Sequence, residues 1–175
     1  MPRLHWTPGE PRRYIQRYPS SQGRDFTDVL DTTDMRDENH HAACVDGWLK
    51  RAPVSPEARL QLFEAAMGAL WARTTTTLGE VTLTAIADRV LHNASEKFPH
   101  FSSLKIESPG GFQFGEFRER ITSIPASELS AGIRFVLVEF LTVLGNLTAE
   151  ILTPELHAEL SHIAPKGSRR EGKKS

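Results

Sequence analysis

The sequence lacks the features that mark several large classes of proteins. Cys44 is the single cysteine among 175 residues, which excludes a disulfide-stapled scaffold and a cysteine-rich zinc module. No apolar run reaches the roughly 18 residues that a membrane-spanning helix needs, and the first 30 residues contain no apolar stretch typical of a secretory signal. Glycine-rich phosphate loops and hydrolase motifs are also absent. We therefore expect a cytoplasmic protein that uses no cofactor and contacts no membrane.

Charges of the two signs are nearly balanced, but they are unevenly distributed. The net charge is −1. Residues 1–24 carry five arginines and one acid, whereas residues 25–52 carry seven acids and three basic side chains. Residues 53–164 carry thirteen acids and eight basic side chains, and residues 165–175 carry five basic side chains and one acid. The near-neutral total is therefore a cancellation between two basic ends and an acidic middle.

The apolar residues divide the chain at the same places. Residues 1–52 show no sustained apolar period and are interrupted by prolines and glycines, so we expect a flexible arm. Residues 53–164 show helical spacing and predict one compact, mainly α-helical domain with a minor β contribution. Residues 165–175 predict a disordered basic tail. The 15 arginines against 6 lysines favour a bacterial source with a GC-rich genome.

Helical signals begin at Ser55-Pro56-Glu57, with a hydroxyl cap, a proline at the first helical position and an acid in the first turn. One face of this helix then carries Leu60, Phe63, Met67, Leu70 and Trp71. We expect the run of β-branched threonines to end it, and Thr77 and Glu80 to form a capping box for the next helix. That helix should end at Pro99, although residues 81–86 also fit a strand. Its expected inward residues are Leu83, Ile86, Ala87, Val90 and Ala94.

A small hairpin and a long helix are predicted to follow. Residues 101–107 and 112–114 fit two strands around a Pro-Gly-Gly turn, and residues 116–121 favour a short helix. The long helix has a stripe at three- and four-residue spacing: Leu129, Ile133, Val136, Phe140, Leu144, Leu147 and Ile151. Residues 135–144 are apolar on nearly all sides, which predicts a central core helix or one face of a large interface. Thr153-Pro154 begins a final short helix with Leu156, Leu160 and Ile163 inward.

Asp88, His92 and Glu96 are candidates for chemistry because they lie one turn apart along the second predicted helix. Neighbouring carboxylates favour the cationic imidazole, which suits a proton carrier or a phosphate acceptor. An ordinary solvated helix face explains the same spacing. Glu139, the one charge in the stretch FVLVEFLTVL, is a weaker candidate that we expect on an exposed polar edge of the long helix.

Metal binding has little support in the sequence. His40 and Cys44 lie one helical turn apart, a spacing that can hold a metal ion. Two ligands do not complete a tetrahedral site, and no second pair is placed to fill it, so we expect a polar linker here and no metal. An acid also recurs at every third position from residue 25 to residue 37. This period does not match a calcium loop, and we expect a solvated acidic stripe able to face a basic partner or to fold back on the arginine-rich residues 1–24.

The arm is the preferred segment for binding a partner. Arginines alternate there with aromatic residues: Trp6, Arg12, Arg13, Tyr14, Arg17 and Tyr18. Such residues can bind phosphates and stack on bases, but the acidic domain would repel nucleic acid. We therefore expect the arm to become ordered on a protein partner.

These observations favour a non-enzymatic regulatory or adaptor protein that acts through protein–protein contacts. The arm is the expected contact segment, and the wide apolar stripe of the long helix also favours a homodimer. Two alternatives stay open: a helical phosphotransfer or signalling module that uses His92, and a nucleic-acid-associated protein that acts through its basic termini. The first needs an accessible His92, and the second needs binding that weakens with salt.

Overall fold

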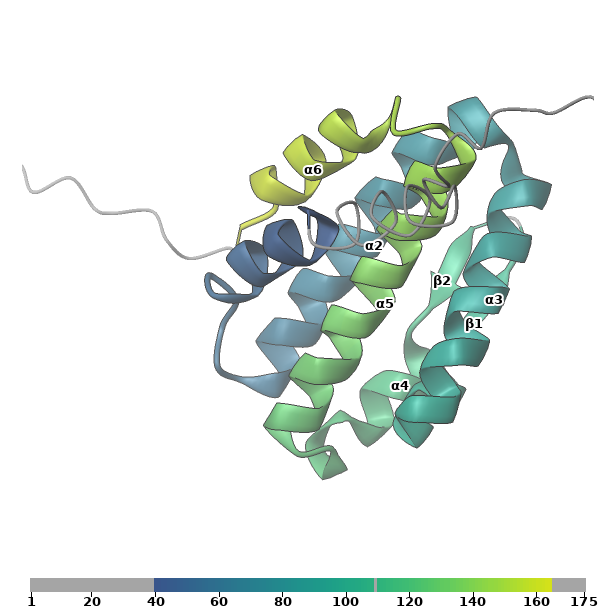
Figure 1. Cartoon of the computed structure of the whole chain (residues 1–175). Helices are drawn as coiled ribbons and strands as arrows, with labels where there is room; N and C mark the ends of the chain where they lie inside the picture. Colours follow the sequence, from purple (N-terminus) through teal and green to yellow (C-terminus); the bar gives the residue numbers. More distant parts are fainter. Residues whose placement is uncertain (1–39, 109, 165–175) are drawn as a thin grey trace, which may run out of the picture.

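The computed structural model describes residues 40–108 and 110–164 and shows a mainly α-helical domain with one small antiparallel hairpin, as predicted (Figure 1). Residues 40–49 form a helix that we call the first helix. The other elements are α2 (Pro56–Leu78), α3 (Glu80–Lys97), a 3-10 helix (Pro99–Ser103), β1 (Lys105–Glu107), β2 (Gly111–Gln113), α4 (Gly115–Arg120), a 3-10 helix (Ile121–Ser123), α5 (Ala126–Leu147) and α6 (Thr153–His162). In these two described stretches, no helix combines the length and apolar character needed to cross a bilayer.

Helix α5 forms the centre of the domain. It contacts α2, α3 and α6, and Figure 1 shows these helices on different sides of it. Its buried residues cover much of its circumference: Leu129, Gly132, Ile133, Val136, Leu137, Phe140, Leu141, Leu144 and Gly145. Packing within one chain therefore explains most of the long apolar stretch that favoured a dimer.

Helix α2 begins as predicted, with the Ser55 hydroxyl accepting a hydrogen bond from the amide of Ala58 at 3.4 Å. The prediction that the threonine run ends this helix is wrong, because the helix continues to Leu78. The hydroxyls of Thr74 and Thr75 each donate to the carbonyl four residues earlier, at 2.7 Å. These bonds satisfy the hydroxyls without breaking the helix.

Gly79 separates α2 from α3. Its φ of 75° lies in the left-handed region that glycine adopts readily. The predicted capping box is wrong, because Thr77 lies inside α2 and no side chain caps α3, whose first residue is Glu80. Residues 81–86 are helical rather than a strand. The five residues of α3 predicted to point inward are all buried: Leu83, Ile86, Ala87, Val90 and Ala94.

The hairpin has Ile106 opposite Phe112 in its register. Its first strand is shorter than predicted, because residues 99–103 form a 3-10 helix instead. At the start of β2, Gly111 has a φ of 84°, and a Cβ placed there would lie 2.9 Å from Cδ2 of Trp71. Both the backbone conformation and the close approach of the indole therefore require glycine.

The folded domain begins before the predicted boundary at residue 53. Val45 and Trp48 of the first helix are 0% and 1% exposed, and the Trp48 indole donates to the carbonyl of Ile163 at 3.1 Å. Residues 40–52 therefore belong to the domain rather than to the arm. The apolar pattern of this helix is weak because one of its three inward positions is His41, which counts as polar. Residues 1–39 and 165–175 lie outside the described residues.

Two apolar side chains at the end of α5 are exposed, although the stripe predicted them to be buried. Leu147 is 57% exposed and Ile151 is 77% exposed. Helix α5 ends at Leu147, and the backbone of Ala149 and Glu150 has φ values of 48° and 62°. The chain therefore leaves the helical path before Ile151, and the 3.6-residue period no longer decides which side it faces.

Candidate functional site

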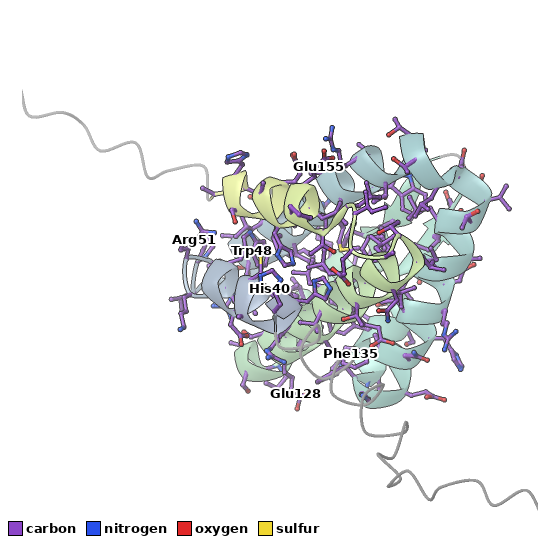
Figure 2. All side chains as sticks on the ribbon, turned by 45° about the horizontal axis from the view of Figure 1, so that its top comes forward. His40, Trp48, Arg51, Glu128, Phe135 and Glu155 are labelled. Atoms are coloured by element: carbon purple, nitrogen blue, oxygen red, sulfur yellow. The ribbon has the colours of Figure 1, made fainter. Side chains whose placement is uncertain are left out.

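A groove of about 480 Å³ lies beside α5, next to the end of α3 and the first helix. Its lining residues are Ala42 of the first helix, Lys97 and Phe98 at the end of α3, and Ala131, Arg134, Phe135, Val138 and Glu139 of α5. The α5 residues are spaced by three and four positions, so they form one face of that helix. Figure 2 labels Phe135 in this groove, together with His40 and Trp48 on the first helix beside it.

The floor of the groove is apolar, and two charged side chains are fixed at its edge. The Nζ atom of Lys97 lies 4.2 Å from the centroid of the Phe135 ring, a cation–π contact that leaves the ammonium exposed. Asn93 donates a hydrogen bond from Nδ2 to Oε1 of Glu139 at 3.1 Å. Glu139 is half-buried, so the predicted exposed edge is wrong. The amide of Asn93 supplies the partner that a half-buried carboxylate needs.

The third charge in the groove, Arg134, ties α5 to the first helix. The Nε atom of Arg134 donates to Oδ1 of Asp46 at 2.6 Å, and its Nη2 atom donates to Oδ2 of Asp46 at 3.1 Å. This hydrogen bond holds the pKa of Asp46 below its usual value and raises the pKa of Arg134. Because the two side chains are 42% and 45% exposed, the pair is worth about 0–1 kcal/mol. The pair links Arg134, a lining residue on α5, to the first helix, which supplies the lining residue Ala42.

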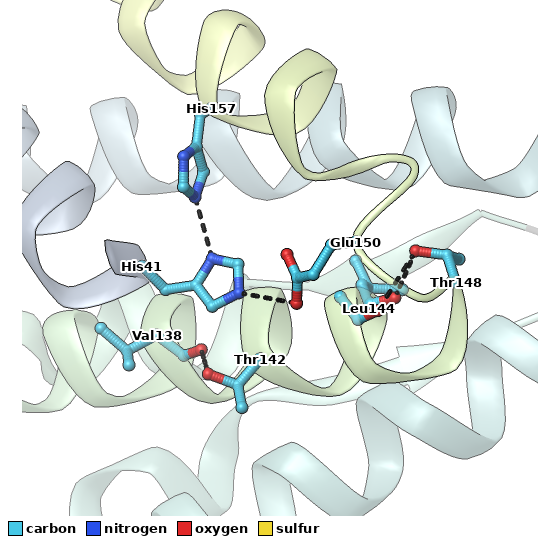
Figure 3. A network of polar contacts seen from close by, with 8 residues as sticks. His41, Val138, Thr142, Leu144, Thr148, Glu150 and His157 are labelled. Carbon is cyan, nitrogen blue, oxygen red and sulfur yellow. Dashed lines mark hydrogen bonds and ion pairs between the residues drawn. The ribbon is translucent and has the colours of Figure 1, made fainter. Parts of the chain in front are cut away.

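A second polar cluster lies between the first helix, α6 and the loop after α5 (Figure 3). Nδ1 of His41 is 2.8 Å from Nε2 of His157, and Nε2 of His41 is 3.8 Å from Oε1 of Glu150. The rings of His40 and His157 have centroids 4.7 Å apart. Only His41 is deeply buried, at 1% exposure. Three histidines and one carboxylate therefore meet where three segments of the chain join.

The loop after α5 holds Glu150 in this cluster. The Glu150 amide donates to the carbonyl of Gly145 at 2.8 Å, and its φ of 62° is unusual for a residue with a side chain. A Cβ on Gly145 would lie 2.9 Å from Cδ of Glu150. Glycine at position 145 therefore leaves the space that the carboxyl group occupies beside His41.

The cluster changes the acid–base behaviour of His157. Its pKa is lowered from 6.5 to about 4, first by burial and then by the neighbouring imidazoles of His41 and His40, whereas Glu150 acts in the opposite direction. His157 is therefore neutral at pH 7. Because a carboxylate faces Nε2 of His41, we assign the His41 proton to that nitrogen, and Nε2–H of His157 then donates to Nδ1 of His41.

The predicted trio on α3 lies on the surface. Nε2 of His92 is 3.6 Å from Oε1 of Glu96, and these side chains are 73% and 68% exposed. Asp88, one turn earlier, is exposed as well. The structure thus brings His92 and Glu96 together in an accessible position, and phosphotransfer or proton-transfer chemistry there stays a prediction.

The remaining predicted site residues divide into two groups. His40 is exposed and Cys44 is half-buried on the first helix, where burial raises the pKa of the Cys44 thiol. Across the described residues 40–108 and 110–164, no group of three or more His, Cys, Asp or Glu side chains could hold a metal ion. The arm residues form the second group and lie outside the described residues: Trp6, Arg12, Arg13, Tyr14, Arg17 and Tyr18.

Sequence reasoning did not find the groove or the histidine cluster. The groove combines residues from three separate elements, and His41 and His157 are 116 positions apart. The one available signal for the groove was the excess of apolar positions on the long helix. Comparison with protein-family models, curated proteins and solved structures finds no match to this chain.

Proposed function

We propose that this chain is a non-enzymatic regulatory or adaptor protein that binds a partner protein through the groove beside α5. The observation that supports this proposal is the apolar floor of the groove. Phe98, Phe135 and Val138 remain only half-buried, in contrast to the fully buried residues on the other sides of α5. Covering these side chains would remove further apolar surface from water, which is the main driving force of protein association.

The groove fits the apolar face of a short amphipathic helix. Its lining on α5 extends from Ala131 to Glu139, which is about 12 Å at a rise of 1.5 Å per residue. Helix-in-groove recognition uses apolar residues at three- and four-residue spacing over about this length. The exposed ammonium of Lys97 at the edge adds an electrostatic preference. We therefore propose a partner helix with an acidic residue beside its apolar face.

The chemistry of the groove favours binding over catalysis. Each of its charged side chains already has a neighbour: Phe135 for Lys97, Asp46 for Arg134, and Asn93 for Glu139. Residues 53–164 carry thirteen acids against eight basic side chains, a balance that disfavours nucleic acid as the ligand. The basic and aromatic arm residues remain our proposed second contact with the partner. A cytoplasmic location, a bacterial source and a homodimer remain predictions from the sequence.

Substitution of two exposed alanines tests the proposal. Ala131 lines the groove, whereas Ala72 is exposed on α2 and is not among the lining residues. Ala131→Glu would place bulk and negative charge where the partner helix docks. Ala72→Glu introduces the same change outside the groove and serves as the control. Both positions are exposed and helical, so neither variant should unfold the domain.

The measurement is quantitative affinity purification of the full chain and both variants from cells that make this protein. We expect at least one co-purifying protein to be depleted about tenfold or more by Ala131→Glu, as expected for loss of about 1.4 kcal/mol, and to be retained by Ala72→Glu. Equal recovery of every co-purifying protein with all three chains would contradict binding through the groove.

A further inference from the structure

The first helix is joined to α6 by contacts that respond differently to acid. The Trp48 indole bonds to the carbonyl of Ile163, just after α6, at 3.1 Å, and this contact has no titratable group. The 2.8 Å contact between His41 and His157 joins the same two segments and consists only of titratable groups. The attachment of the first helix to α6 therefore depends in part on the protonation of two imidazoles.

A hydrogen bond between two imidazoles needs one protonated and one unprotonated nitrogen at the contact. A first added proton leaves the bond intact, because a cationic ring can donate to a neutral one. A second added proton makes both rings cationic, so that neither can accept and the two repel each other. Because His41 is 1% exposed, water cannot readily solvate the second charge in place.

The other charged groups around the pair do not remove this effect. His40, on the first helix, faces His157 with ring centroids 4.7 Å apart and brings no negative charge to the pair. Glu150, from the loop after α5, lies 3.8 Å from Nε2 of His41 and can compensate for one positive charge.

We propose that His41 and His157 form a pH-operated latch that holds the first helix against α6 and releases it on acidification. Release would move Ala42, which lines the groove on the side of the first helix. The latch would therefore open that side of the groove in acid. The opening itself does not depend on the proposed partner, so it can be tested on the isolated chain.

The sign and size of the effect follow from His157, whose pKa is lowered by burial and in part by the charge of a cationic His41, and so describes the second proton added to the pair. Its pKa in the folded chain is about 4 against an ordinary value of 6.5, so the closed state binds its proton less tightly than the open state. Neutral His157 contributes fully to the stability of the closed state above about pH 6.5. This contribution decreases as the pH falls and is lost below about pH 4. Between pH 7.5 and pH 5.0, these values give an increase of about 30-fold in the open fraction.

Cys44 offers a native probe of this opening. It is the single cysteine of the chain, and it is half-buried on the first helix and packed against the core. The rate of its reaction with 4,4′-dithiodipyridine can be measured at each pH on the full chain. Dividing it by the rate for the same chain unfolded in urea at that pH corrects for the pH dependence of the thiol itself.

The expected result is a relative rate that rises about 30-fold from pH 7.5 to pH 5.0 in the unchanged chain. His157→Gln, which cannot become cationic, should abolish most of this rise. His92→Gln, a matched change at the exposed histidine of α3, should retain it. A relative rate that does not change with pH, or an equal rise in His157→Gln, would overturn the proposal.

Hydrogen exchange on the unchanged chain provides a test that needs no variant. After correction for intrinsic exchange, amides of the first helix and of α6 should lose protection at pH 5.0, whereas amides in the centres of α2 and α5 should keep it. Equal loss of protection in all four helices would indicate general acid unfolding and would contradict a local latch.

Discussion

Two glycines inside long helices should respond in opposite ways to the same substitution. Gly132 lies on the buried side of α5, where a Cβ would come within 2.6 Å of Cζ of Phe101. Phe101 is 1% exposed and packs against Phe117 at a centroid distance of 4.9 Å, so its ring has little room to move. Gly68 lies on the exposed side of α2, with no atom within 4 Å of a Cβ placed there.

The expected magnitudes follow from two opposing effects. Alanine is favoured over glycine in a helix by about 1 kcal/mol, and this gain applies at both positions. At Gly132 the added methyl group must also displace a packed ring, and such overpacking costs about 1–3 kcal/mol or more. Because the ring contact is far shorter than van der Waals distance, we expect the upper part of this range. Gly132→Ala should then destabilise the domain by about 2 kcal/mol, whereas Gly68→Ala should stabilise it by about 0.5–1 kcal/mol.

Urea unfolding followed by circular dichroism measures both values at neutral pH. The unchanged chain and the two variants should share a similar slope, so that the shift in midpoint reports the change in stability. The reasoning would be refuted if the two substitutions changed the free energy of unfolding in the same direction. It would also be refuted if Gly132→Ala proved neutral, because Phe101 would then have room that the structure does not show.

Three further substitutions test single interactions by the same unfolding assay. Ser55→Ala removes the N-cap of α2 and should cost about 1 kcal/mol; no change would mean that this cap adds nothing. Trp48→Phe removes the donor to the carbonyl of Ile163 and should cost about 0.5–1.5 kcal/mol, the net contribution of a typical hydrogen bond. Arg134→Ala breaks an exposed ion pair and should cost less than about 1 kcal/mol. A larger loss would show that the pair contributes more than an exposed ion pair normally does.

Local chemistry in the sequence predicted most of the fold. Ser55-Pro56-Glu57 defined the start of α2, the periodic residues of α3 and α5 predicted their buried faces, and the Pro-Gly-Gly turn located the hairpin. These features act over a few residues, so one sequence is enough to interpret them. The failures came where tertiary contacts decide. The threonines of α2 satisfy their hydroxyls within the helix, and Trp48 of the first helix bonds to a carbonyl 115 positions later in the chain.

The candidate site could not be predicted in the same way. Its residues come from three elements far apart in the sequence, and neither Ala42 nor Phe98 has a distinctive type or spacing. His41 was visible only as a neighbour of His40 and Cys44, and its partner His157 stood alone in the sequence. The apolar excess of α5 was correctly recognised, but most of it is used inside the domain. Part of what remains accessible forms the floor of the groove, where Phe135 and Val138 lie beside Phe98.

Site-specific photo-crosslinking would show whether the groove receives a partner helix. In one variant of the full chain, a benzophenone amino acid replaces Ala131 in the groove, and in the control variant it replaces Ala72 on α2. Both variants are produced in cells that naturally make this protein. Mass spectrometry then identifies the residues that become attached. We expect position 131, and not position 72, to attach to apolar positions of one amphipathic helix with an acidic flank in another protein. Attachment from position 131 to no protein, to a second copy of this chain or to its own residues 1–39 would contradict the proposed function.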